Sequence, residues 1–215
     1  MSNTPARQRL FIAVGLSPDA RAAFTAAQDE LRRLDLPVRW VAPHGAHLTL
    51  KFLGDTDPAL VTPLGDTLRA VATEQQPFAL RLAAPDAFPN WRRPRVLWLG
   101  LTGALDRLQG LHAALEAALT PLGIPREHRP FAPHLTLGRV RDDRARALAN
   151  AAPRIDEALT RLVARRGTPL PVATLHLIRS NLHPAGARYT TLRTAPLGAA
   201  TPGGPPTGMP GQMQR

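Results

Sequence analysis

A repeated tetrapeptide constrains the fold of this chain more than any other feature of its sequence. The sequence His-Leu-Thr-Leu at 47–50 recurs at 134–137, 87 residues later. At the composition of this chain, two such hits among its seven histidines are expected by chance only about once in ten thousand. We therefore interpret the copies as an internal repeat, which predicts a fold with two related lobes.

Each copy of the repeat is expected to lie on a β-strand that divides its side chains between two faces. Residues i and i+2 of a strand point to the same side. The His and the Thr of each copy therefore share one face, while both leucines point to the other face, into a core. If the two strands lie beside each other, one cleft is lined by His47, Thr49, His134 and Thr136.

This set of side chains suits phosphodiester cleavage without a metal ion. One imidazole can take a proton from water while the other, protonated, gives one to a leaving oxygen. Two hydroxyls can donate hydrogen bonds to the non-bridging oxygens of a phosphoryl group. The motifs contain no carboxylate for a hard metal ion, and two histidines are too few for a standard zinc site. We therefore expect no metal and no cofactor.

Two further residues occupy matching positions, five residues after each histidine. They are Phe52 and Arg139. An odd offset points them away from the cleft on a regular strand, so they reach it only if the strand ends, twists or bulges. Gly138 permits such an irregularity beside Arg139. In the cleft, the arginine would hold phosphate charge and the phenylalanine would stack on a base.

Strands and helices are expected to alternate through the chain. Apolar runs predict strands at 10–16, 39–41, 47–53, 78–85, 96–101, 134–140, 172–180 and 188–192. Capping residues and longer amphipathic segments predict helices at 17–34, 57–73, 104–119 and 142–166, the last interrupted at Pro153. No Gly/Ser-rich linker separates them, so we expect one α/β or α+β domain with two lobes.

Charge and cysteine content narrow the function classes. Of the 215 residues, 27 are Lys or Arg and 16 are Asp or Glu, giving a net charge of +11. Such an excess fits a polyanionic partner such as RNA, although an arginine-rich composition explains it nearly as well. Cysteine is absent, which excludes disulfides, thiolate nucleophiles and zinc fingers and fits a reducing cytoplasm.

The end of the chain differs in composition from the rest. Residues 196–215 contain 10 Pro or Gly and a single charged side chain. This composition predicts a disordered tail after an ordered domain at 1–195. We also find no signal peptide and no apolar run long enough for a membrane span, so no membrane partner is expected.

The motifs resemble the two-histidine (2H) phosphoesterase superfamily, whose signature is two H-x-T/S-x motifs. More narrowly, the chain is similar to the RNA 2',3'-cyclic phosphodiesterases, also called 2'-5' RNA ligases. The resemblance runs over most of residues 9–193. Its pieces are RLFIA at 9–13, RWV at 39–41, HLTLKFLG at 47–54, FPN at 88–90, RPRVLW at 93–98, PHLTLGR at 133–139 and RY at 188–189.

The resemblance implies a bilobal α+β fold with pseudo-twofold symmetry. Two antiparallel sheets, each flanked by helices, would enclose the active-site cleft between the lobes. This single domain would occupy residues 1–195. We also expect a monomer.

The same resemblance implies hydrolysis of 2',3'-cyclic phosphates on RNA ends or nucleotides to 2'-phosphates, with possible reversible 2'-5' RNA ligation. By motif position, His47 matches the general acid and His134 the general base. Thr49 and Thr136 match phosphate-binding hydroxyls. Substrate-contacting positions of the family match Phe52 and Arg139, and Tyr189 is a further candidate.

Two alternatives remain open at this point. Another 2H phosphoesterase would act on small cyclic nucleotides or ADP-ribose cyclic phosphate. A non-catalytic RNA-binding module would bind RNA in a salt-sensitive way without hydrolysis. The basic, aromatic loop with Trp91, Arg92, Arg93 and Arg95 is a further candidate RNA contact.

Overall fold

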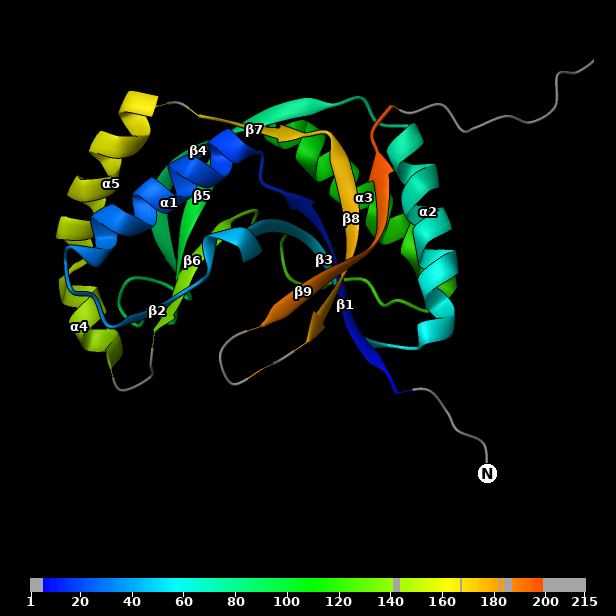
Figure 1. Cartoon of the computed structure of the whole chain (residues 1–215), viewed down its shortest axis with the longest axis horizontal. Helices are drawn as coiled ribbons and strands as arrows, with labels where there is room; N and C mark the ends of the chain where they lie inside the picture. Colours follow the sequence, from blue (N-terminus) through cyan, green and yellow to red (C-terminus); the bar gives the residue numbers. More distant parts are fainter. Residues whose placement is uncertain (1–5, 141–143, 167, 182, 184–186, 199–215) are drawn as a thin grey trace, which may run out of the picture.

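The computed structural model describes residues 6–140, 144–166, 168–181, 183 and 187–198 (Figure 1). Its strands are β1 Gln8–Gly15, β2 Val38–Trp40, β3 His47–Thr56, β4 Phe78–Phe88, β5 Val96–Gly103, β6 Leu135–Val140, β7 Pro169–Val172, β8 Thr174–Asn181 and β9 Arg188–Pro196. Its α-helices are α1 Pro18–Arg32, α2 Val61–Thr73, α3 Leu105–Leu119, α4 Ala145–Asn150 and α5 Ala152–Arg166.

The strands form one curled antiparallel sheet with two halves. One half has the order β7-β4-β5-β6, with β2 pairing beyond β6, and the other has the order β3-β1-β8-β9. The two halves meet where β3 pairs with β6, at Leu48 and Leu135. The predicted α+β class is confirmed, and the two predicted sheets are joined at this pair into a single sheet.

The internal repeat extends beyond the two motifs. Helix α3 begins and ends 87 residues after α1, the same separation as that of the motifs. Strand β5 likewise follows β1 by 88 residues at both ends. The halves also exchange strands, because β4 pairs with β5 while β8 pairs with β1. The pseudo-twofold arrangement therefore includes helices and strands that carry no motif.

Helices cover the outer face of each half of the sheet. Helices α1, α4 and α5 lie together beside β4 and β7, whereas α2 and α3 lie beside β8, β9 and β3 (Figure 1). Between helices and sheet lies a leucine-rich core that includes Leu48 and Leu135, both with no exposed surface. No helix in the described part of the chain is long and apolar enough to cross a membrane.

Some predicted elements differ from those in the structure. The strand predicted at 172–180 corresponds to β8, which begins at Thr174, whereas Val172 ends a separate strand, β7, that pairs with β4 and was not predicted. Strand β4 continues past the predicted end to Phe88, with a bulge near Pro85 that accommodates the missing backbone N–H. The last helical segment divides at Ala151, and Pro153 instead lies in the first turn of α5.

The domain also continues slightly past its predicted end at residue 195. Strand β9 includes Pro196, and Leu197 is buried in the core. Residues 196–198, which were predicted to belong to the tail, are therefore part of the ordered domain. The rest of the predicted tail, residues 199–215, lies outside the described residues.

One glycine sits where the sheet leaves no room for a side chain. A Cβ at Gly138 would overlap a methyl group of Val38 and lie 2.9 Å from the carbonyl oxygen of Arg39. We expect Gly138→Ala to lower the free energy of unfolding by about 1–3 kcal/mol, because β2 must move. In exposed Gly110 of α3 a Cβ would meet nothing within 4 Å. Gly110→Ala should therefore raise stability by about 0.5–1 kcal/mol.

Urea unfolding of both variants measures the difference. The account of β2 packing fails if Gly138→Ala is as stable as the parent protein while Gly110→Ala behaves as expected.

Candidate active site

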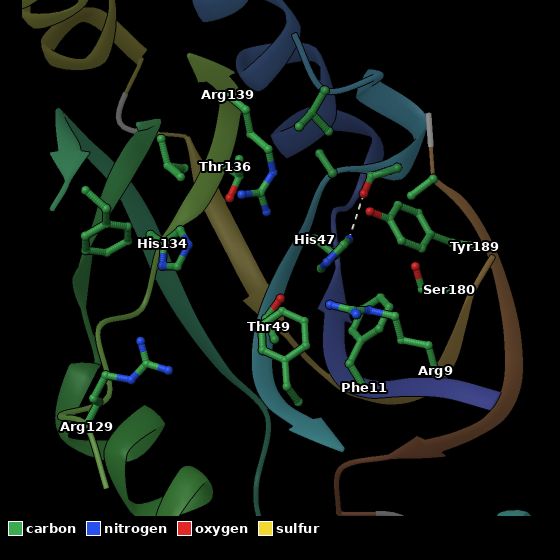
Figure 2. Close-up of a pocket in the computed structure, with 17 residues that line it drawn as sticks. Arg9, Phe11, His47, Thr49, Arg129, His134, Thr136, Arg139, Ser180 and Tyr189 are labelled. Carbon is green, nitrogen blue, oxygen red and sulfur yellow. Dashed lines mark hydrogen bonds between the residues drawn. The ribbon is translucent and has the colours of Figure 1, made fainter. Parts of the chain in front are cut away.

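The pairing of β3 with β6 gathers the four repeated polar side chains. Leu48 and Leu135, the paired residues, occupy equivalent positions of the two motifs and point into the core. Their neighbours along each strand point to the opposite face. In Figure 2, His47 and Thr49 on one strand face His134 and Thr136 on the other across an open space. The strands run in opposite directions, so each histidine lies across from the threonine of the other copy.

Both histidines are oriented by the same backbone contact. His47 Nδ1 lies 2.7 Å from the carbonyl oxygen of Gly45, and His134 Nδ1 lies 2.7 Å from that of Ala132. A carbonyl oxygen can only accept a hydrogen bond, so Nδ1 must donate and carry a proton. In the neutral ring the other nitrogen, Nε2, is then free to accept a proton from a ligand.

A bulge at the same position of each motif redirects the residues that follow. In β3, Thr49 pairs with Ala13 and Lys51 with Ile12, so Leu50 is an extra residue. In β6, Thr136 pairs with Trp98 and Gly138 with Leu97, so Leu137 is an extra residue. An extra residue shifts the alternation by one.

The bulges bring the two residues at odd offset to the cleft. Leu50 and Lys51 are both buried, as are Leu137 and Gly138, and the next residue of each strand points outward. Phe52 and Arg139 therefore line the same pocket as the histidines. The sequence predicted that Phe52 and Arg139 reach the cleft only if the strand ends, twists or bulges, and a bulge is present in each strand.

Aromatic rings flank each histidine. The His47 ring lies 4.7 Å from Phe11 and 5.1 Å from Tyr189, centroid to centroid. The His134 ring lies 4.8 Å from Phe88 and 5.6 Å from Trp98. These rings fix the imidazoles and withdraw them from water.

The surroundings lower the pKa of both histidines. Burial is the main cause in each case and lowers the pKa below 6.5, while the carbonyl hydrogen bond opposes it. Positive charge adds to the effect: Arg139 lowers the pKa of His134, and His134, when protonated, lowers that of His47. Both rings therefore favour the neutral form more than a free histidine does.

The pocket has a volume of about 520 Å³ and a basic lining. Arg9, Arg129 and Arg139 contribute guanidinium groups, and no carboxylate is among the described residues that line it. Such a lining attracts anions. Among the described residues, no three acidic or histidine side chains are grouped so as to hold a metal ion.

Several lining residues carry no motif that would reveal them. Arg9 and Phe11 come from β1, and Ser180 and Tyr189 come from β8 and β9. They reach the pocket through strand pairing, which the sequence does not encode locally. Of these, only Tyr189 was a candidate from the resemblance.

The remaining histidines and the basic loop lie elsewhere. His44, His112, His128, His176 and His183 do not line this pocket. Arg92 and Arg93 do not line it either, and Arg95 borders a neighbouring groove.

A buried ion pair fixes the segment that leads into the second motif. Lys51 Nζ lies 2.6 Å from Glu116 Oε1 and donates to the carbonyl oxygen of Pro125 at 2.8 Å. Glu116 Oε2 accepts from the backbone N–H of Glu127 at 3.2 Å. The pair thus ties the segment before His134 to β3 and α3.

The fold and the pocket together define a class: an α+β protein in which two repeated His-x-Thr strands face one basic pocket. The chain belongs to the 2'-5' RNA ligase superfamily, whose family model matches residues 16–184.

Curated relatives agree with this assignment. The RNA 2',3'-cyclic phosphodiesterase of Geobacillus stearothermophilus is 36% identical over 210 residues, covering 96% of this chain and 62% of that protein. This chain thus spans less than two thirds of that relative. The RNA 2',3'-cyclic phosphodiesterase of Methanothermobacter thermautotrophicus is 32% identical, covering 86% of this chain and 96% of that protein.

Solved structures share the fold. The protein TT0787 of Thermus thermophilus superposes with a TM-score of 0.69 at 30% identity, covering 90% of this chain and 100% of that chain. E. coli LigT complexed with 3'-AMP superposes with a TM-score of 0.65 at 26% identity, covering 89% of this chain and 98% of that chain.

The buried ion pair allows a stability test. Lys51→Met removes the ammonium partner of the buried Glu116 carboxylate and leaves His112 Nε2, 3.5 Å from Oε1, as its nearest ionisable neighbour. We expect a loss of about 3–5 kcal/mol in the free energy of unfolding. Lys51→Met combined with Glu116→Leu removes both charges and should recover most of that loss.

The surface pair Arg69–Asp66 provides a matched control, because its side chains are 52% and 61% exposed. Arg69→Met should change stability by less than about 1 kcal/mol. Denaturant unfolding of the four proteins decides the point: a double variant no more stable than Lys51→Met contradicts the expected rescue.

Proposed function

We propose that this protein hydrolyses the 2',3'-cyclic phosphate at RNA ends to a 2'-phosphate, without a metal ion. The observation that carries the proposal is the pair of imidazoles in one basic pocket, each with Nδ1 held by a carbonyl oxygen, which leaves Nε2 for a ligand. The names of the curated relatives support the same reaction.

Hydrolysis requires one neutral and one protonated histidine. His134 Nε2 takes a proton from water as the water oxygen bonds to phosphorus. The bond from phosphorus to O3' breaks, and His47 Nε2 donates its proton to O3'. The products are a 2'-phosphate and a 3'-hydroxyl, and proton exchange with solvent restores both rings.

The surroundings of the rings are compatible with this division of roles. Burial, and to a lesser extent the permanent charge of Arg139, lowers the pKa of His134 and favours the neutral form that a base must have. Burial also lowers the pKa of His47, and a charged His134 lowers it further, so His47 is protonated more readily while His134 is neutral. The two protonation states are therefore compatible.

The other residues of the pocket act on the phosphate and the nucleoside. The hydroxyls of Thr49 and Thr136 donate hydrogen bonds to the non-bridging oxygens, where charge increases in the transition state. Arg139 offsets the charge of the phosphate. Phe52, which is 62% exposed, offers a ring on which a base can stack.

The same groups would serve ligation. If an RNA 5'-hydroxyl takes the place of water, His134 removes its proton and the product carries a 2'-5' phosphodiester bond. The leaving O3' receives its proton from His47 as in hydrolysis.

Removing either imidazole should abolish most turnover. We expect His47→Ala and His134→Ala each to lower kcat by about 10²- to 10⁴-fold on a nucleoside 2',3'-cyclic phosphate, because each ring moves a proton. His128→Ala, outside the described pocket, is the matched control and should retain full activity.

These assays are run in excess EDTA, with the products identified by chromatography. Unchanged activity in EDTA and a 2'-phosphate product support the proposal. Dependence on added metal, or near-normal turnover by either pocket variant, contradicts it.

The pKa shifts predict the pH dependence. The product of one neutral and one protonated fraction is greatest midway between the two pKa values. Burial lowers both pKa values below 6.5, so kcat/KM, which reports the free enzyme, should pass through a maximum below pH 6.5.

Bound phosphate favours the protonated rings and raises both pKa values, so the maximum of kcat should lie at higher pH than that of kcat/KM. Initial rates across pH 4.5–9 at about constant ionic strength measure both profiles. A kcat/KM profile that is still rising above pH 7 is incompatible with two histidines of lowered pKa.

A further inference from the structure

A second pocket lies directly beside the one that holds the histidines. Its volume is about 570 Å³, and it shares part of its lining with the first, including Thr49, Phe52, Arg129 and His134. We call this second pocket the side groove. A molecule held at the two histidines can therefore extend into the side groove without leaving the protein surface.

Two flat rings that stack on each other line the side groove and do not line the first pocket. His112 of α3 and Phe131 stack with centroids 4.1 Å apart and planes 5° from parallel. Phe52 lies at the boundary between the two pockets and is largely exposed. Rings held in place can stack on a flat ligand with little loss of conformational freedom.

The charges of the two pockets differ. Among the described residues, the charged groups that line the first pocket are arginines and the two histidines, whereas the side groove is lined by the cations of Lys51, Arg95 and Arg129 and by the carboxylates of Glu116 and Glu127. Glu116 is buried and held by Lys51, so the accessible carboxylate is that of Glu127. The first pocket therefore suits a phosphate, and the side groove, with charges of both signs, suits a neutral, flat group. A nucleobase is such a group, and a carboxylate can accept from its exocyclic amine.

Arg129 lies at the junction and lines both pockets. In Figure 2 it lies on the segment that leads into β6, beyond His134 as seen from Arg139. A chain that passes from the histidines to the side groove brings its linking phosphodiester near this guanidinium group.

We propose that the side groove binds the nucleobase of the nucleotide that precedes the cyclic phosphate. This rests on the proposed function and deepens it: the substrate is then an RNA end of at least two nucleotides, and a small cyclic mononucleotide fills only the first pocket. The groove is preorganised, because the Lys51–Glu116 pair holds one wall and the segment that carries Phe131.

The test compares adenosine 2',3'-cyclic phosphate with the dinucleotide adenylyl-adenosine 2',3'-cyclic phosphate. Stacking of one base on an aromatic side chain should favour the dinucleotide by about tenfold in kcat/KM. Phe131→Leu keeps an apolar side chain but removes the ring, so it should lose most of this preference while retaining activity on the mononucleotide. Phe131→Tyr restores a ring and should retain the preference.

Two results overturn the side groove as a base site. One is equal kcat/KM for the two substrates in the parent protein, and the other is an equal loss on both substrates in Phe131→Leu. Affinities of the corresponding 2'-phosphorylated mononucleotide and dinucleotide, measured by calorimetry, give an independent reading. If neither cyclic phosphate is hydrolysed, the proposed reaction is wrong. The groove is still supported in that case if the 2'-phosphorylated dinucleotide binds more tightly than the mononucleotide and Phe131→Leu weakens only the binding of the dinucleotide.

Discussion

The candidate site depends on one antiparallel contact, the pairing of Leu48 with Leu135. The two residues are equivalent positions of a repeat, so their pairing places a local twofold axis between the strands. Both leucine side chains are fully buried, and this burial fixes which face of each strand points into the core. A register shift of one residue would turn the polar side chains into the core. The hydrophobic packing of two leucines thus holds two imidazoles and two hydroxyls around one pocket.

The two halves then depart from symmetry in a functional way. The bulge at the last residue of each motif is the same, but the residue that it buries next is Lys51 in β3 and Gly138 in β6. Gly138 lets β2 approach closely, whereas Lys51 forms the ion pair that holds the segment before His134. The residues turned outward are Phe52 and Arg139, one suited to a base and the other to a phosphate. A symmetric frame thus presents an asymmetric surface.

Much of this could be predicted from the sequence, because the decisive pattern is local. The period of two within each motif assigns the faces of His47 and His134, and the exact recurrence implies that the strands are related. The direction of Phe52 and Arg139 could be stated only conditionally, since a bulge depends on the partner strand. Arg9 and Phe11 could not be identified, because the pairing of β1 with β3 brings them in from a distant part of the chain. The division of the segment at 169–181 into β7 and β8 likewise depends on pairing with different halves of the sheet.

The central claim is that one phosphate is held between the two histidines, with an imidazole on either side. A crystal structure of the protein with adenosine 2'-phosphate tests it most directly. The account predicts His47 Nε2 and His134 Nε2 within about 3.2 Å of different phosphate oxygens, with the Thr49 and Thr136 hydroxyls on the remaining ones. A phosphate bound away from this pocket, or contacted by only one of the two histidines, contradicts it.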